Sequence, residues 1–384
     1  MSNQYKKTKI ILSIIGISFV QGLQFSISPV LGQIKLHYPD VNISLIQMLI
    51  TAPTLLSMVM SVAVGSLVVR ISKKKLLLVG CFITGITGFI PFVSDSFLLL
   101  FLSRTIYGIG LGIATTLNVA VVAEFFKEKE RVVVMGIQAA SVGAGMVIIT
   151  VASGLLGTKG FQYAYFIHII GFIAMFLIAA CLPDTGIQKT NQHEPIKLNK
   201  TVAAIAAVGF MEFLFLITFS TNLSMHLSGS LAGSTSVSGN LTGVFSGAQI
   251  LVGLILGLIT NKYTIPTAMF SFTIGAVFLI LFPSQAALLM VGAMFCGFSQ
   301  GLFVPTAMVI LSNSVTPTAT AMATACFNVA VCLGQLLSPA VLNTVSKSIF
   351  GEVTTSNVYM VSSIGMMITA LIAVIVISKN KKVH

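Results

Sequence analysis

Residues 183–200 read PDTGIQKTNQHEPIKLNK, the longest polar stretch in a chain of 384 residues. Six long apolar runs precede this stretch and six follow it. Hydrophobic residues make up 56% of the chain and charged residues only 8%, whereas soluble domains carry about 25% charged residues. A soluble core cannot explain this composition, because too few polar side chains remain to cover it. The sequence therefore predicts an all-α membrane protein with twelve transmembrane helices in two six-helix bundles.

Each apolar run is long enough to cross a bilayer, which takes about 20 mainly apolar residues in a helix. We interpret the first run as a spanning helix and not as a removed signal, because no small-residue cleavage site ends it before a soluble domain. We expect residues 1–182 to form an N-terminal bundle, 183–200 a cytoplasmic linker and 201–384 a C-terminal bundle. The runs are 9–34, 44–69, 75–93, 97–123, 132–157, 161–182, 201–226, 238–261, 265–283, 286–311, 317–345 and 355–378.

The positions of the 21 basic residues predict the orientation, because Lys and Arg are retained on the cytoplasmic side during insertion. With the N-terminus inside, seventeen of them fall on the inner side and only Lys35, Lys159 and Lys347 on the outer side. We therefore expect a multi-pass protein of the cell membrane with both termini in the cytoplasm. The net charge of +12 then needs no nucleic-acid partner. Arg104 is the one basic residue left over, inside the fourth run.

Among the few ionisable side chains that lie away from the ends of the apolar runs, Arg104 and Glu212 are the strongest candidates for a functional role. A charge at the bilayer centre costs about 2.5–3.5 kcal/mol on insertion scales, so each needs a partner or a water-filled cavity. Burial disfavours the charged form of a carboxyl group, and such a group can take up a proton on one side and release it on the other. Structural explanations stay open: Arg104 can reach the interface through its long stem, and Glu212 can be a permanently protonated, hydrogen-bonded group.

Uncharged polar side chains recur in the middle of the runs. A lipid-facing amide would be unsatisfied, so we expect these groups to face inward, either as substrate contacts or as hydrogen bonds between helices. Phe215 and Phe219 follow Glu212 at three and seven residues, which predicts an aromatic wall on the same helical face. His168 and His226 lie nearer run ends, and we expect structural roles for them. The candidate substrate contacts are Gln24, Gln138, Phe215, Gln300 and Asn328.

Patterns typical of enzymes lack the structural context that they need. GFSQG at 297–301 matches the GxSxG pattern of a nucleophile elbow, but it lies in a spanning run with no preceding strand. GIGLG at 108–112 lacks the βαβ setting of a dinucleotide site. The five cysteines form no CxxC pair and are interpreted as small packing residues. We therefore expect no enzymatic activity, no cofactor and no metal site.

Three motifs resemble signatures of the major facilitator superfamily. GSLVVRISKK at 65–74 resembles the family's loop signature GxLaDRxGRR, with Val69 in place of the usual Asp. The helix 4 signature RxxxGxG is intact at Arg104, Gly108 and Gly110. GIQAASVGAG at 136–145 is similar in part to the GxxxGPxxGG signature of drug/proton antiporters, with Ser141 in place of its Pro.

The resemblance implies two halves that expose a midplane site to either side in turn. It implies that helices 1, 4, 7 and 10 line the central cavity, and Gln24, Arg104, Glu212 and Gln300 fall on these four. It also implies that the basic loop pairs with an acid at the inner end of helix 4, which is Glu124 here. The gating motif is then Gly65, Arg70, Lys73 and Glu124.

The leading hypothesis is a proton-coupled secondary transporter of the drug/proton antiporter type that exports amphipathic small molecules. Glu212 would exchange the proton and Arg104 would assist it. One alternative is uptake or facilitated diffusion of a polar metabolite such as a sugar or organic anion. A lipid flippase and a non-transporting receptor or sensor are further alternatives. The expected partners are a small-molecule substrate, protons and the lipid bilayer, and we expect a monomer.

Overall fold

The computed structural model describes residues 2–187, 199–228, 234–259, 262–315 and 320–380, which form helices and connecting turns without a strand. Within these residues, twelve helical spans are long and apolar enough to cross a membrane. They coincide with the twelve apolar runs of the sequence, so the predicted all-α fold with twelve transmembrane helices is confirmed. Most of the predicted linker, residues 188–198, lies outside the described residues.

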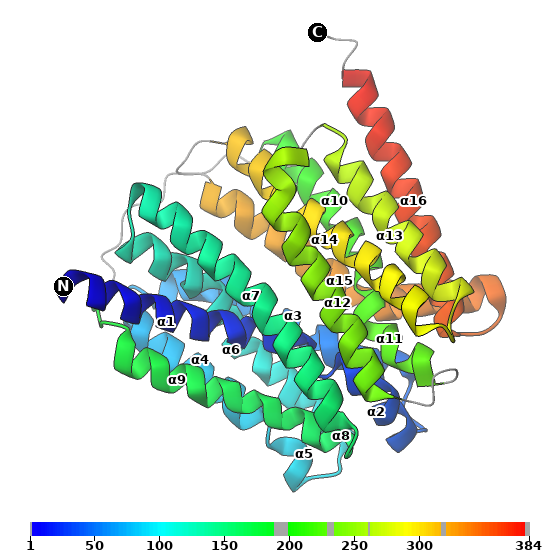
Figure 1. Cartoon of the computed structure of the whole chain (residues 1–384), viewed down its shortest axis with the longest axis horizontal. Helices are drawn as coiled ribbons and strands as arrows, with labels where there is room; N and C mark the ends of the chain where they lie inside the picture. Colours follow the sequence, from blue (N-terminus) through cyan, green and yellow to red (C-terminus); the bar gives the residue numbers. More distant parts are fainter. Residues whose placement is uncertain (1, 188–198, 229–233, 260–261, 316–319, 381–384) are drawn as a thin grey trace. The chain divides into compact units, whose positions relative to one another are not determined.

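The chain divides into two compact units (Figure 1). Unit 1 comprises Met1–Ile27 and Leu49–Glu194, and unit 2 comprises Ser28–Met48 and Pro195–His384. The sequence assigns 28–48 to the N-terminal bundle, whereas its contacts place this segment in unit 2. We call Ser28–Met48 the outer hairpin, because it joins the predicted outer ends of the first two spans. That residues 1–182 and 201–384 form two bundles that move against each other stays a prediction.

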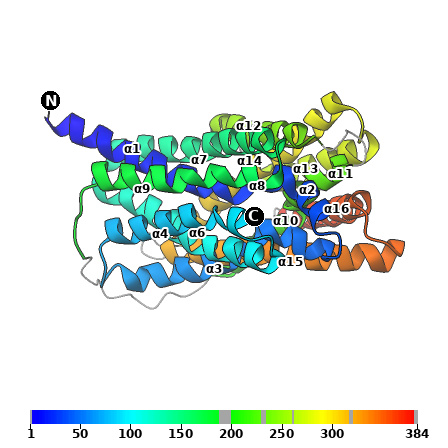
Figure 2. The ribbon, with the colours of Figure 1, turned by 90° about the horizontal axis from the view of Figure 1, so that it is seen from below.

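In unit 1, α1 packs against α6, α7 and α9, and α4 packs against α6 and α9 (Figure 2). The core that these helices share is aliphatic and includes Ile14, Leu77 and Val122. The elements of unit 1 are α1 (Ser2–Gly22), η1 (Leu23–Phe25), the part of α3 (Ile43–Leu67) from Leu49 onward, α4 (Lys73–Thr87), α5 (Ile90–Val93), α6 (Phe97–Phe125), α7 (Glu128–Gly157), α8 (Phe161–Ala164), η3 (Tyr165–His168) and α9 (Ile169–Cys181).

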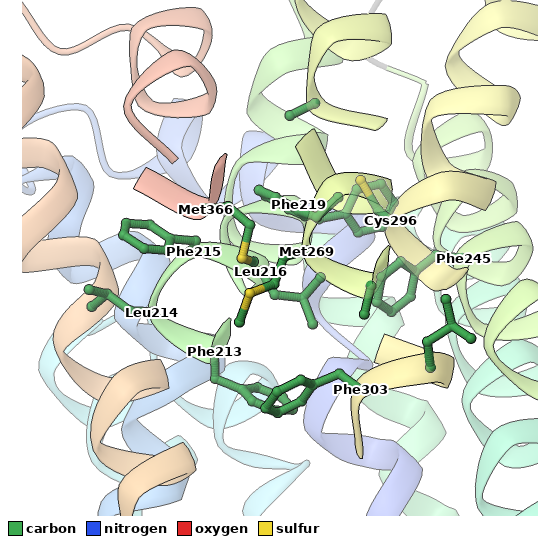
Figure 3. Close-up of a cluster of buried hydrophobic side chains, with 14 of the residues drawn as sticks. Phe213, Leu214, Phe215, Leu216, Phe219, Phe245, Met269, Cys296, Phe303 and Met366 are labelled. Atoms are coloured by element: carbon green, nitrogen blue, oxygen red, sulfur yellow. The ribbon is translucent and has the colours of Figure 1, made fainter. Parts of the chain in front are cut away.

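In unit 2, α10 pairs with α15, α12 with α14, and α13 with both α14 and α16. The core of this unit is rich in Phe, including Phe213, Phe245 and Phe303 (Figure 3). The elements of unit 2 are η2 (Ser28–Val30), α2 (Leu31–His37), the first turns of α3, α10 (Lys200–Leu216), α11 (Thr218–Ser228), α12 (Thr235–Ile259), α13 (Thr264–Leu281), α14 (Ala286–Ser314), α15 (Thr320–Phe350) and α16 (Thr355–Asn380).

The first and seventh spans are interrupted rather than continuous. In the first span, α1 ends at Gly22 and two short 3-10 turns, η1 and η2, precede α2. Pro29 lies in η2 and has no N–H to donate to the ladder, which favours this break. In the seventh span, α10 ends at Leu216 and α11 begins at Thr218. In transporters, such interruptions expose backbone groups near the midplane.

Candidate functional site

Arg104 is buried in unit 1, with 1% of its surface exposed. Its Nε donates to the Leu49 carbonyl oxygen over 2.9 Å, and its Nη2 donates to the Gln24 carbonyl oxygen over 2.8 Å. The guanidinium also lies 5.0 Å from the ring centroid of Tyr107, a favourable cation–π distance. Arg104 therefore does not reach the interface through its stem. It joins α6 to α3 and to η1.

Both carbonyl groups that Arg104 contacts lie where a helical ladder is broken. In α3, the Leu49 carbonyl would accept from the N–H of residue 53, and that residue is Pro53, which has none. Gln24 lies in η1, beyond the end of α1. An unsatisfied carbonyl in lipid costs several kcal/mol, on the order of a lost hydrogen bond in an apolar medium. Arg104 satisfies these two carbonyls with charge-assisted hydrogen bonds, which are the stronger kind.

His168 completes the surroundings of Arg104. Arg104 Nη1 lies 3.1 Å from His168 Nε2, and His168 Nδ1 lies 3.2 Å from the Tyr165 carbonyl oxygen. Arginine can only donate, so Nε2 accepts and Nδ1 carries the proton that it donates to Tyr165. The imidazole also stacks on the Tyr165 ring, with centroids 5.5 Å apart. The structural role expected for His168 thus consists of holding a buried cation.

Gly108, four residues after Arg104, lets α6 approach the same break in α3. A Cβ at Gly108 would clash with the Pro53 carbonyl oxygen. Gly110 faces α4, where a Cβ would clash with Thr84 and with the Gly80 carbonyl oxygen. The RxxxGxG signature therefore has a physical explanation in this chain: its Arg and first Gly both contact the segment around Pro53, and its second Gly allows close packing on α4.

Glu212 is the buried acid of unit 2, with 0% of its surface exposed. Ser299 of α14 donates its hydroxyl to Glu212 Oε1 over 2.7 Å. The other carboxyl oxygen, Oε2, is also buried, and within the described part of the chain it has no hydrogen-bond partner. One carboxyl oxygen is therefore held in place by α14, and the role of Glu212 in proton exchange stays a prediction.

The two Phe residues expected to form an aromatic wall beside Glu212 pack against different helices. Glu212 contacts α14 through Ser299, whereas the Phe215 ring lies against Gly365 of α16. Phe219 follows the break at Ile217 and stacks on Phe245 of α12, with ring centroids 4.7 Å apart. Figure 3 shows Phe215 and Phe219 in different parts of the core. The three side chains thus contact three different helices, and the aromatic wall beside Glu212 stays a prediction.

The other predicted substrate contacts differ in exposure. Gln24, Gln138 and Gln300 are partly buried, and Asn328 is exposed on α15. Gln24 contributes its backbone carbonyl to Arg104. Arg104 and Gln24 belong to unit 1, whereas Glu212 and Gln300 belong to unit 2. Their convergence on one cavity stays a prediction, as does the substrate-binding role of Phe215.

The predicted gating motif lies at the inner ends of α3, α4 and α6. Lys73 Nζ lies 3.0 Å from Glu124 Oε2, so the basic loop and the acid at the inner end of α6 form an ion pair. Arg70 and Gly65 are exposed. Next to the pair, Ser72 caps α4 and donates to the Asp184 carboxylate. The contact that the resemblance implies is present, and the gating role of these four residues stays a prediction.

A polar cluster in unit 2 that the sequence did not predict holds the outer hairpin. Gln47 Nε2 donates to Asn222 Oδ1 over 2.7 Å, and Asn343 Nδ2 donates to Gln47 Oε1 over 2.6 Å and to Ser44 Oγ over 2.8 Å. We call Ser44, Gln47, Asn222 and Asn343 the amide cluster. The signal in the sequence is amide side chains near the ends of apolar runs, whereas the predicted substrate contacts lie nearer the run centres.

Ser224 adds a second attachment of the outer hairpin to α11. Its hydroxyl donates to the Pro29 carbonyl oxygen over 2.7 Å and accepts from the Gly32 N–H over 3.0 Å. Ser28 donates to the Ser220 carbonyl oxygen over 2.6 Å. The two Ser224 bonds satisfy backbone groups at the break in the first span, where the helical ladder cannot, and the Ser28 bond joins the same segment to the backbone of α11. They explain why 28–48 groups with the C-terminal helices.

Comparison with protein families gives a match over nearly the whole chain. The family model described as Major Facilitator Superfamily matches residues 12–205 and 205–384. Among curated proteins, the riboflavin transporter RibZ of Clostridioides difficile (strain 630) is 29% identical over 154 residues. That match covers 40% of this chain and 34% of RibZ, so the chain matches about a third of the length of this curated relative.

Solved transporter structures share the fold at low sequence identity. The POT family transporter PepTSo superposes with a TM-score of 0.82 at 8% identity, covering 99% of both chains. The nucleoside transporter NupG gives 0.75 at 14% identity, covering 95% of this chain and 98% of that one. A bacterial homolog to the human lysosomal transporter Spinster gives 0.69 at 14% identity, covering 97% and 96%. At such identities the likeness shows the fold alone.

The fold and the family match lead to one assignment. Twelve apolar spans make the chain a multi-pass membrane protein, and the RxxxGxG signature forms a structured site around Arg104. The chain belongs to the major facilitator superfamily.

Proposed function

We propose that the protein is a proton-coupled secondary transporter that exports amphipathic small molecules across the cell membrane. Glu212 exchanges the proton, and Arg104 supports the site from the N-terminal half. Substrate contacts come from Gln24, Gln138, Phe215, Gln300 and Asn328, as the sequence predicts. The protein works as a monomer, in which two bundles alternate around a midplane site.

The observation that carries the proposal is the position of Glu212. It is completely buried, and Ser299 holds one carboxyl oxygen while the other has no partner in the described residues. The helix ends one turn later, at Leu216, and such interruptions mark sites of coupling ions in transporters. Arg104 donates to backbone carbonyls and to His168, so we place the proton exchange itself on Glu212.

The electrical driving force is adequate for export. One proton that crosses a potential of 100 mV contributes about 2.3 kcal/mol. This corresponds to a concentration gradient of about fortyfold for each proton, because a tenfold ratio takes about 1.4 kcal/mol. For an uncharged substrate, one carboxyl group that loads on one side and unloads on the other therefore suffices for concentrative export. Exchange of one proton for one monovalent cation moves no net charge, so the pH gradient drives it.

Transport in proteoliposomes tests this proposal. The full-length protein is reconstituted, a pH gradient is imposed, and movement of a fluorescent lipophilic cation such as ethidium is followed. We expect the gradient to drive transport in the wild type and to have no effect in Glu212→Gln. Glu352→Gln, which changes an exposed acid of the same unit, is the matched control and should respond like the wild type. A Glu212→Gln protein that still follows the gradient would refute proton exchange at this residue.

A second candidate function is uptake or facilitated diffusion of a polar heterocyclic metabolite. The similarity to a riboflavin transporter, at 29% identity over 154 residues, favours it. A counterflow assay distinguishes the two candidates. Proteoliposomes are loaded with unlabelled riboflavin or with unlabelled ethidium, and entry of the labelled form of each is measured. Accumulation of labelled riboflavin alone would favour the metabolite, whereas accumulation of ethidium alone would favour the exporter.

A further inference from the structure

Arg104 holds the two places at which the outer hairpin leaves unit 1. The chain passes from unit 1 to unit 2 after Ile27 and returns to unit 1 at Leu49. Arg104 donates to the carbonyl of Leu49 itself and to that of Gln24, three residues before the other crossing. A single side chain of α6 thus bonds next to both ends of a segment that is itself hydrogen-bonded to α11 and α15.

Both crossings coincide with interruptions of helical hydrogen bonding. On one side, η1 and η2 replace the α-helix. On the other side, Pro53 leaves the Leu49 carbonyl without the N–H that a helix would provide. Helices bend where their ladder is interrupted, and hinges consist of a few residues at element ends that absorb changes in φ and ψ. The backbone at both ends of the outer hairpin has the properties of a hinge.

His168 determines where the guanidinium points. It accepts from Arg104 Nη1, and the proton on its own Nδ1 goes to the Tyr165 carbonyl. The ring cannot retreat, because it stacks on Tyr165 and because the backbone at Gly88 is so close that a Cβ there would clash with the His168 side chain. With Nη1 held by His168, Nε and Nη2 are directed at the two carbonyls.

We propose that Arg104 is the hinge clamp of the outer hairpin and that His168 is its positioning residue. The clamp fixes the backbone in unit 1 at the two crossings, near Ile27 and Leu49, which we call the pivots. The segment between the pivots can then exchange its hydrogen-bond partners while the transporter alternates. Arg104 acts here through hydrogen bonds to the backbone and needs no contact with substrate or proton. The inference therefore stands whether or not Glu212 exchanges protons.

Pro53 makes the clamp testable. In Pro53→Ala, residue 53 gains an N–H that can bond to the Leu49 carbonyl, so Arg104 is no longer needed there. Hydrogen–deuterium exchange of the full-length protein in nanodiscs is measured on peptides that cover 23–30 and 45–53. We expect Arg104→Gln to raise exchange in both regions by about tenfold, because charge-assisted bonds to two carbonyls are lost. In the Pro53→Ala background, the increase over 45–53 should be several times smaller, whereas that over 23–30 should persist.

Variants of His168 separate positioning from packing. His168→Phe keeps a ring on Tyr165 but removes the acceptor, and we expect exchange to rise over 23–30 and 45–53. His168→Gln retains an acceptor oxygen and should stay closer to the wild type. His226→Phe is the matched control, because His226 is a buried histidine of unit 2 that bonds to Thr355 and to the Leu279 carbonyl. The increase in exchange that it causes should be confined to parts of unit 2 outside residues 23–30 and 45–53.

Two results would overturn the hinge clamp. One is an increase in exchange over 45–53 that Arg104→Gln produces equally in the wild-type background and in the Pro53→Ala background. The other is local exchange in His168→Phe that does not differ from the wild type. Should Arg104→Gln fail to fold, the comparison of His168→Phe with His168→Gln still decides the question. None of these measurements depends on transport, so they are independent of the proteoliposome test of Glu212.

Discussion

Asn343 Nδ2 donates a 2.6 Å hydrogen bond to Gln47 Oε1, which joins α15 to the outer hairpin. Gln47 Nε2 in turn donates to Asn222 Oδ1 of α11. All three side chains are buried. In lipid, polar groups of this kind find their partners on neighbouring helices because water is absent. The amide cluster is therefore one of two polar attachments described between the outer hairpin and the C-terminal helices, beside that of Ser224 and Ser28.

Replacing Asn343 by Ala should loosen the outer hairpin. The change leaves Gln47 Oε1 without its donor, and interhelical hydrogen bonds in membranes contribute about 0.6 kcal/mol on average and up to about 1.7 kcal/mol. We expect hydrogen exchange over 28–48 to rise severalfold in the full-length protein. Asn240→Ala, which changes an exposed amide of α12, is the control. Equal exchange in the two variants would contradict the role given to the cluster.

Ser299→Ala should destabilise the region around Glu212. Loss of the hydroxyl leaves a completely buried carboxyl group without its donor, which costs about 1–3 kcal/mol. We expect a lower thermal unfolding midpoint in detergent. Ser299→Thr keeps the hydroxyl and should lose much less. In the Glu212→Leu background Ser299→Ala should have little effect, and a full-sized effect there would show that the serine acts through another contact.

The ion pair between Lys73 and Glu124 should respond to charge reversal. Its side chains are only 13% and 26% exposed, so salt screens the pair less than a fully exposed one. We expect Glu124→Lys to impair transport, and the double exchange with Lys73→Glu to restore part of it. The pair of Lys7 and Glu130 in the same unit is 37% and 56% exposed and is the matched control. Reversal there should change transport little.

Gly108→Ala should cost stability, because the new methyl group would clash with the Pro53 carbonyl. Overpacking of this kind costs about 1–3 kcal/mol. Gly65→Ala is the control, because its Cβ would meet no atom within 4 Å. In that variant the better helix propensity of Ala should leave the midpoint unchanged or raise it slightly. Thermal unfolding of both proteins in the same detergent checks the prediction, which fails if Gly108→Ala is as stable as the wild type.

Asp184 should make the inner end of unit 1 sensitive to acid. The Gly186 N–H and the Ser72 hydroxyl donate to its carboxylate, and they hold the pKa of Asp184 below its ordinary value. A carboxylate with a depressed folded pKa stabilises the fold above its unfolded pKa of about 3.9, and this contribution is lost as the pH falls through the folded pKa.

The comparison of wild type with Asp184→Asn measures this contribution. We expect hydrogen exchange over 70–76 to be slower in the wild type at neutral pH, and the difference to disappear below the folded pKa of Asp184. Asp40→Asn, on the loop between the first two spans, is the control. A difference between wild type and Asp184→Asn that does not change with pH would contradict the role of the charge.

The sequence by itself determined the membrane fold. Twelve apolar runs and the placement of Lys and Arg are local properties of the chain, and they depend on the energy of each segment in lipid. The sequence also identified Arg104 and Glu212, because a buried charge stands out in an apolar run. It indicated Glu124 as the partner of the basic loop through the family resemblance. These features can be predicted without knowing which helices contact each other.

Only the tertiary structure decided what these residues contact. Nothing in the sequence links Arg104 to the Leu49 carbonyl. That carbonyl lacks its helical donor because residue 53 is a proline, and both Leu49 and Pro53 lie on another helix, α3. The break at Ile217 turned Phe219 toward α12, which a continuous helical period could not predict. The outer hairpin joined unit 2 through Gln47, Asn222 and Asn343, which lie far apart in the chain. Hydrogen bonds between distant segments depend on packing, and packing is a property of the folded chain as a whole.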